Sequence, residues 1–332
     1  MKRALIVGID SYPSQRSLTG CVADAVALHA LLARHADGTP NWDALLITSD
    51  NALEITRDSL RRALTRLFGN ARDADLLFYF AGHGGQTPWG ADLMTQDATT
   101  HSLGVSMNDL VTLANDSPAR SITIVLDCCF SGDIGNSPGL RAAGVAENFR
   151  LDRAVLRENL TIMAASRATE PSQESAGHGV FTRILLEGLD GGATDHRGNV
   201  TALSLYGYLS PAFSAWQQRP VLKTSLTEPV VLRVGAPWLD LGMLRDLPRH
   251  FPAEDHRLQL TPAHEGDGRP LPPDDRGTFE QQQFDYVGRL RNAHLVTTDD
   301  LRDHYWVAMD SGYVYLTPLG RHFWRLADRG IL

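Results

Sequence analysis

The strongest constraint on the fold is a pair of near-continuous apolar runs, "ADLLFYFAGHGG" at residues 74–85 and "SITIVLDCCFSG" at residues 121–132. Strands that read as unbroken aliphatic and aromatic residues are typical of parallel sheets, because helices cover both faces of such sheets. The first run ends in a histidine between glycines, and the second ends in an acid and two adjacent cysteines. We therefore expect a buried parallel sheet with reactive side chains at the ends of two strands.

Other strand and helix patterns alternate with these two runs over the first two thirds of the chain. Further strands are predicted at residues 3–10, 42–50 and 159–168, helices at 21–36, 52–71, from near Ser106, at 181–189 and at 202–215, and extended chain over 219–234. This order predicts an α/β fold with a mostly parallel six-stranded sheet and helices on both faces.

The chain has 332 residues, which is long for one core, and its texture changes beyond Pro237. We expect a domain over residues 1–235, a Pro/Gly-rich linker over 236–278 and a small, mainly helical C-terminal domain over 279–332. The last domain reads as two helices, a short hairpin with "DSG" at its turn, and a closing helix, which resembles a winged helix. Its candidate recognition helix, "TTDDLRDHYWVAM", is acidic at its start and has few basic residues, which favours a regulatory or protein-interaction module over a DNA reader or a structural cap.

Composition limits the partners and the compartment. The formal net charge of −8 argues against binding to nucleic acid or to an anionic membrane through the overall field. The opening "MKRALIVGID" reads as a strand rather than a signal peptide, and no apolar run reaches the roughly 18 residues of a membrane span. Three cysteines, one necessarily unpaired, fit a reducing compartment, so we expect a cytoplasmic protein.

His83 and Cys129 form a candidate catalytic pair. Both follow predicted strands, and ligands of parallel sheets bind at the carboxyl ends of the strands. A thiol needs a nearby base to become a nucleophilic thiolate at neutral pH, and the amides of Gly84 and Cys129 are candidate donors to an oxyanion. Because side chains alternate along a strand, Asp127 and Cys129 should point to one side and Cys128 should pack on the other.

The same residues allow plainer interpretations. Cys21, Cys128, Cys129 and His83 could instead bind zinc, but there is no CxxC pair, and adjacent cysteines rarely chelate one tetrahedral ion. Asp24, taken alone, reads as a solvated helix residue.

The motifs "FAGHGG" and "DCCFSG" resemble the Ser-Gly-His-Gly and Asp-x-Cys-His-Ser-Gly runs of metacaspases and the wider caspase-like cysteine peptidases. The histidine precedes the cysteine by 46 residues, near the spacing of about 50 in caspases. The early "GCVADA" and the late "GHGVFTRILLEGL" resemble two further elements of the family. The resemblance covers residues 3–235 and implies a caspase-like sandwich.

The resemblance also implies roles for single residues. His83 matches the catalytic histidine, Cys129 the nucleophile, and Gly84 a residue whose amide helps to form the oxyanion hole. The clan typically works as a Cys-His dyad, and no third catalytic residue is evident from the sequence.

The primary specificity pocket matches as well. Asp24 and Asp127 match its two acids, Cys21 lies beside them, and Ala81 stands where metacaspases often have serine. Two carboxylates in one pocket favour a guanidinium or an ammonium group. We therefore expect an endopeptidase that cuts after Arg or Lys, with protein substrates and an upstream protease or regulatory protein as partners.

Two departures from the family pattern bear on the prediction. Phe130 replaces a histidine that is not the base, and the acids of the family's calcium site are only partly matched, by Asp92, Asp97 and Asp109. We expect no cofactor, with calcium left open by the incomplete motif. The alternatives are a catalytically silent scaffold that binds partners, or a peptidase of the same clan with another primary specificity.

The long segment over residues 133–159 directly follows the nucleophile and carries four arginines, Arg141, Arg150, Arg153 and Arg157. Exposed loops of this length are easily nicked, and basic residues match the expected preference. We expect activating cleavage here, by the protein itself or by another protease. A helix near residues 145–156 with solvated arginines is the alternative.

Overall fold

The computed structural model describes residues 1–50, 54–87, 90–100, 102–129, 155–165, 179–213, 220–237, 239–265 and 277–332, apart from the side chains of Gln86 and Cys129. The chain forms two compact units. The first comprises Met1–Thr194 with Asn199–Ala236, and the second comprises Asp195–Gly198 with Pro237–Leu332.

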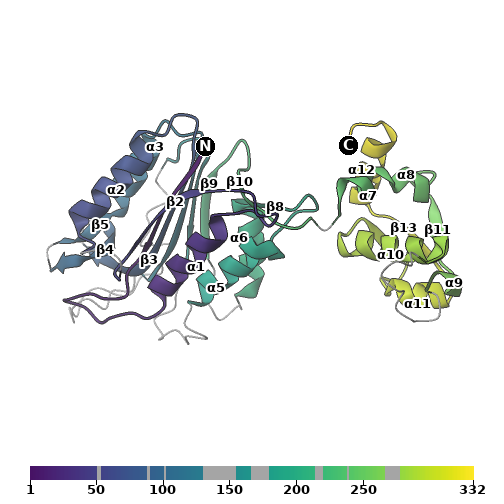
Figure 1. Ribbon diagram of the computed structural model, residues 1–332, viewed down its shortest axis with the longest axis horizontal. Helices are drawn as coiled ribbons and strands as arrows, with labels where there is room; N and C mark the ends of the chain where they lie inside the picture. The colour runs from purple at the N-terminus through teal and green to yellow at the C-terminus, as the bar shows by residue number, and fades with distance from the viewer. Residues whose placement is uncertain are drawn as a thin grey trace. The chain divides into compact units, whose positions relative to one another are not determined.

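The first unit is built on a sheet with the strand order β2-β1-β3-β6-β7-β9 (Figure 1). Its strands are β1 (Lys2–Gly8), β2 (Asp43–Thr48), β3 (Asp75–Thr87), β6 (Ser121–Cys129), β7 (Leu160–Ala164) and β9 (Val221–Ser225). Neighbours are parallel along this path until β9, which runs antiparallel to β7. The predicted, mostly parallel sheet of six strands is confirmed.

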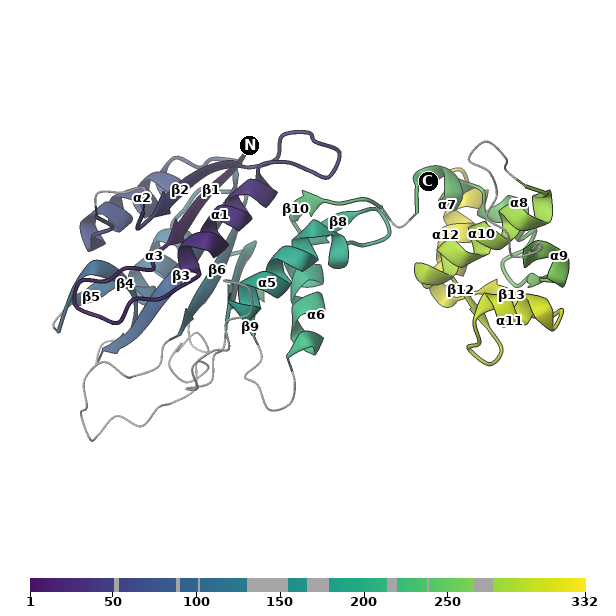
Figure 2. The ribbon, with the colours of Figure 1, turned by 60° about the horizontal axis from the view of Figure 1, so that its bottom comes forward.

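Helices cover both faces of this sheet (Figures 1 and 2). One layer holds α1 (Cys21–Leu32), α5 (Val180–Glu187) and α6 (Ala202–Ala212), and the other holds α2 (Arg57–Gly69) and α3 (Met107–Asn115). Successive residues of β3 enter opposite cores: Phe78 packs with α2 and α3, and Tyr79 packs with α1 and α5. This alternation explains the unbroken apolar sequence of the strand.

A hairpin that the sequence did not predict extends β3. Strands β4 (Gly90–Thr99) and β5 (Ser102–Ser106) pair antiparallel with each other, and β4 pairs with the last residues of β3. The strands come close at Gly104, where a Cβ atom would overlap the carbonyl oxygen of Leu93. The sequence "GADLMTQDAT" mixes polar and apolar residues, so its pattern did not predict a strand. A short antiparallel pair of β8 (Asn199–Thr201) and β10 (Val231–Val234) completes the unit.

The second unit has a three-stranded antiparallel sheet of order β11-β13-β12. Its elements are α7 (Leu241–Arg245), α8 (Leu247–His250), β11 (Arg257–Gln259), α9 (Pro262–Glu265), α10 (Phe279–Asn292), β12 (Val296–Thr298), α11 (His304–Met309), β13 (Tyr313–Leu316) and α12 (Pro318–Asp328). Helix α11 lies between β12 and β13, so the predicted hairpin closed by "DSG" is not formed. Those three residues link α11 to β13 instead.

Part of the predicted linker is folded. Leu247, Phe251 and Leu260 are buried in the core of the second unit, together with Leu290 of α10. Prolines and glycines made this stretch read as a spacer, but its regularly placed apolar side chains anchor it. Among the residues that the structure describes, none of the helices combines the length and apolar character that a bilayer crossing demands.

Candidate active site

The register of β3 and β6 brings the two predicted catalytic residues together. His83 and Cys129 are direct partners across the parallel pair, as are Ala81 and Asp127. Two residues that lie 46 positions apart in the sequence therefore meet at the carboxyl end of neighbouring strands. The side chain of Cys129 lies outside the described part of the chain.

The imidazole of His83 is held by a main-chain carbonyl. Its Nε2 lies 2.7 Å from the carbonyl oxygen of Arg16. A carbonyl only accepts, so Nε2 carries the hydrogen and, in the neutral ring, Nδ1 is the basic nitrogen. Burial lowers the pKa of His83, although the Arg16 carbonyl opposes this effect. The ring is therefore neutral at pH 7 and able to accept a proton.

Tyr12 holds the backbone of the same residue. The amide N–H of His83 donates to the Tyr12 hydroxyl over 2.9 Å, and the centroids of the two rings lie 4.7 Å apart. Tyr12 and Arg16 both belong to the loop between β1 and α1. Sequence reasoning missed both, because a carbonyl carries no residue-type signal. The position of Tyr12 just after a strand was the available clue.

Asp127 and Cys128 face opposite sides of the sheet, as the alternation predicted. The Asp127 side chain is buried, and its Oδ2 accepts a hydrogen bond of 2.6 Å from the Thr182 hydroxyl of α5. Cys128 is buried in the core on the side of α2 and α3. The thiol of Cys128 therefore serves packing.

Asp24 lies in the first turn of α1 and is buried, which rules out a solvated helix residue. Its Oδ2 accepts from the amide of Gly179 over 3.2 Å. Cys21 begins the same helix, and its amide donates to Asp10 Oδ1 over 2.8 Å. Cys21 and Ala81 are both buried in the core between the sheet and α1.

Both acids affect the pKa of the Tyr79 phenol. Burial raises this pKa well above the ordinary value, and the negative charges of Asp127 and Asp24 raise it further. Both carboxylates thus act electrostatically on one buried group. This arrangement suits a cationic ligand.

Gly84, the predicted oxyanion residue, lies opposite Leu93 of β4. The unpredicted hairpin therefore anchors the strand just after the candidate base. The position of Gly84 follows from the pairing of β3 with β4, which no single sequence motif predicted.

The acids of the incomplete calcium motif make other contacts. Asp97 Oδ1 accepts from the Thr95 hydroxyl and the Arg57 amide, and Asp109 pairs with Arg61. Burial raises the pKa of Asp92. Within the described ranges, no cluster of three or more His, Cys, Asp or Glu side chains could hold a metal ion.

Some predicted features fall outside the described residues, among them Phe130, Arg141, Arg150 and Arg153. Arg157 is described, and its guanidinium donates to the carbonyl oxygens of Ser117 and Ala119. This arginine fastens the chain that enters β7.

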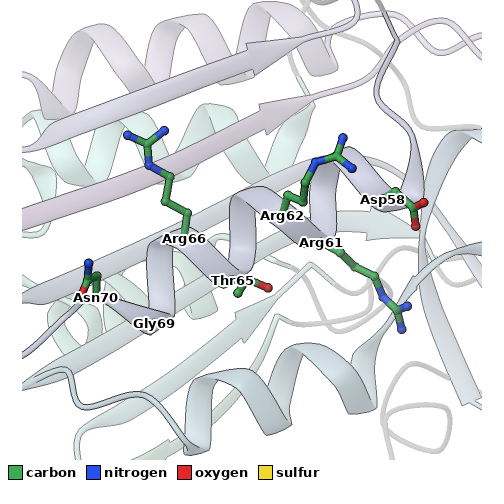
Figure 3. Close-up of a pocket in the computed structure, with 7 residues that line it drawn as sticks. All are labelled: Asp58, Arg61, Arg62, Thr65, Arg66, Gly69 and Asn70. Carbon is green, nitrogen blue, oxygen red and sulfur yellow. The ribbon is translucent and has the colours of Figure 1, made fainter.

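A hollow of about 570 Å³ lies elsewhere, on the exposed side of α2 (Figure 3). Figure 3 shows the side chains of Arg62 and Arg66 both rising from that helix and diverging from each other. The lining of the hollow includes none of the predicted site residues.

Similar proteins point to one family. A family model of the caspase domain matches residues 1–231. Metacaspase-7 of Arabidopsis thaliana is 29% identical over 144 residues, which cover 40% of this chain and 35% of that protein. Metacaspase-3 of Trypanosoma cruzi is 30% identical over 151 residues, 41% of this chain and 42% of that protein. The chain thus spans less than half the length of these relatives.

Among solved structures, protein GSU0716 from Geobacter sulfurreducens aligns with a TM-score of 0.51 and 16% identity. The alignment covers 71% of this chain and 99% of that one, and shows a shared fold. The family model covers well over half of the chain, and the motifs around His83 and Cys129 lie at one sheet edge. The chain therefore belongs to the caspase domain family and has metacaspases among its relatives.

Proposed function

We propose that the chain is a cysteine endopeptidase of the metacaspase type, which cuts proteins after Arg or Lys. The observation that carries this function is the pairing of His83 and Cys129 across β3 and β6, with the imidazole fixed by the Arg16 carbonyl. A base that is neutral at pH 7 and oriented at a strand end suits the activation of a thiol on the next strand.

The reaction runs through an acyl-enzyme. Nδ1 of His83 takes the proton of the Cys129 thiol, and the thiolate attacks the scissile carbonyl carbon. The amides of Gly84 and Cys129 bind the oxyanion, and the proton passes from His83 to the leaving amine as the C–N bond breaks. Water then adds to the thioester, gives a proton to His83, and releases the acid as the thiol forms again. The Arg16 carbonyl stabilises the imidazolium present between these transfers.

The preference for a basic residue rests on Asp24 and Asp127. Both carboxylates are buried, and the charge of each raises the pKa of Tyr79. A desolvated acid pair recognises a guanidinium or ammonium group far better than a carboxylate.

Cleavage within residues 133–154 is proposed as the activating step. Of the four arginines in the loop, Arg157 has its guanidinium bonded to two carbonyls, which disfavours it as a cut site. The expected sites are therefore Arg141, Arg150 and Arg153.

Reporter peptides ending in Arg, Lys or Asp test this function. Wild type should cleave the Arg and Lys peptides, whereas Cys129→Ala and His83→Ala should not. Cys128→Ala is the matched cysteine control, because this thiol packs in the core. Intact mass of wild type and Cys129→Ala after incubation shows whether new ends within 133–154 require the nucleophile. A preference for the Asp peptide, or equal loss in both cysteine variants, would contradict the assignment. A further outcome is a wild-type protein that folds and is cut in that loop, yet neither cleaves a peptide nor reacts with an Arg-directed electrophile. That result would identify a silent scaffold instead.

A further inference from the structure

The first turn of α5 contacts both buried acids of the candidate pocket. The amide of Gly179, the N-cap residue, donates to Asp24, and the hydroxyl of Thr182 donates to Asp127. Asp24 comes from α1, and Figure 2 shows α1 and α5 side by side on one face of the sheet. A helix N-terminus stabilises negative charge, so this turn is a suitable support for two carboxylates.

The hydrogen bonds around Thr182 have a defined direction. The single hydroxyl hydrogen of Thr182 goes to Asp127 Oδ2 over 2.6 Å. The Tyr79 hydroxyl lies 2.7 Å from the same Thr182 oxygen, so Tyr79 must be the donor of that second bond. Burial keeps the pKa of the Tyr79 phenol well above its ordinary value, so the phenol retains its hydrogen at any working pH.

This relay is buried. Tyr79 and Thr182 are both 0% exposed and Asp127 is 2% exposed, so bulk water competes little for these three groups. The relay ends on the acid two residues before the nucleophile. Its members come from three elements, β3, β6 and α5, so the hydrogen bond to the carboxylate links the sheet to the helix.

We propose that Thr182 and Tyr79 are positioning residues that set the orientation of the Asp127 carboxylate and thereby the preference for Arg over Lys. This inference rests on the proposed function. A guanidinium binds a carboxylate through two parallel bonds and needs a fixed plane, whereas an ammonium is a point charge that tolerates rotation. Loss of the Thr182 bond should loosen the carboxylate and therefore penalise Arg substrates more than Lys substrates.

Thr182→Val keeps the shape of the side chain and removes the relay. We expect KM for an Arg reporter to rise about tenfold, as fits the loss of one hydrogen bond to a charged group, with kcat within about twofold of wild type. KM for the matched Lys reporter should rise no more than about threefold. Tyr79→Phe removes only the outer donor, so about a threefold fall in the Arg-to-Lys ratio is expected. Thr182→Ser should restore the wild-type ratio.

Thr161→Val is the matched control. Thr161 is also a buried threonine, and its hydroxyl bonds the Thr224 hydroxyl between β7 and β9, away from any carboxylate of the pocket. It should lose stability to urea without any change in the Arg-to-Lys ratio. The rate of alkylation of Cys129 by iodoacetamide at pH 7 checks that the dyad is unaltered in each variant.

An active wild type whose Arg-to-Lys ratio is unchanged in Thr182→Val overturns this inference alone. An equal change of that ratio in Thr161→Val overturns it as well. A wild type that cleaves neither peptide overturns the proposed function and this inference with it. If Thr182→Val does not fold, Tyr79→Phe decides: an unchanged Arg-to-Lys ratio in that variant refutes the relay.

Discussion

Gly82→Ala should disturb the candidate base through Tyr12, and Tyr12→Phe should relieve part of that disturbance. Gly82 is not among the glycines of positive φ, so alanine is allowed by the backbone. A Cβ atom at this position would lie 2.5 Å from the Tyr12 hydroxyl oxygen, and 3.1 and 3.2 Å from two ring carbons of Phe80. The hydroxyl is therefore the main obstacle.

The magnitude follows from these contacts. Overpacking of this kind costs about 1–3 kcal/mol of unfolding free energy, and Gly82→Ala should lie near the upper end, because moving Tyr12 also strains its bond with the His83 amide. Tyr12→Phe leaves that amide without its acceptor and should cost about 1–2 kcal/mol. In the double variant the clash is gone and the bond is already lost. Its cost should therefore fall about 1–2 kcal/mol below the sum of the single variants.

A double-mutant cycle by urea denaturation measures this coupling. Hydrogen exchange of the β3 amides measures the same coupling free energy near His83. This measurement does not include unfolding of the second unit. The tight contacts with Phe80 remain in the double variant, so it should stay less stable than Tyr12→Phe alone. Additive costs, within about 0.5 kcal/mol, would show that the hydroxyl is not the obstacle and would refute this reasoning.

Arg120→Ala should lower the unfolding free energy by about 2–3 kcal/mol at pH 7, because it leaves the buried Asp75 without its bidentate partner. Burial alone raises the pKa of Asp75, but bonds to its neighbours hold it below the ordinary value. That stability is present above about pH 4 and lost as pH falls through the folded pKa, so denaturation curves of wild type and variant should converge in acid. The acid limb of kcat/KM should lie below the ordinary histidine value of 6.5, because burial lowers the pKa of His83, and a limb above that value would contradict a buried neutral base. Gly320→Ala should destabilise the second unit, since its Cβ atom would overlap the carbonyl oxygen of Leu295. Scanning calorimetry of the full chain should show one transition lowered and the other retained.

The sheet and the juxtaposition of His83 and Cys129 were predictable because their signals are strong and local. Both faces of β3 and β6 are buried, so their sequences contain almost no polar residue until the ends, where His83 and Asp127 stand out. The alternation rule then separated Asp127 from Cys128 correctly. The predicted start of α2 is too early, because the Thr56 cap falls inside an otherwise helical pattern.

The supports of the site were not predictable, because they arise from packing between distant segments. The carbonyl that holds His83 belongs to Arg16 only by position, since any residue there would offer the same oxygen. The partner of Thr182 depends on how α5 lies against β6, which periodicity does not determine. Leu247 and Phe251 likewise became core residues only when the second unit folded around them.

The strand order also governs when the site comes into existence during synthesis. The strand that pairs with the end of β3 is complete only 46 residues after His83. The relay to Asp127 also needs Thr182, which is 53 residues beyond Cys129. At roughly 5–20 residues per second, the ribosome takes about 3–10 s to pass from the nucleophile to that threonine. A nascent chain therefore carries both His83 and Cys129 for several seconds before Thr182 is available to bond Asp127.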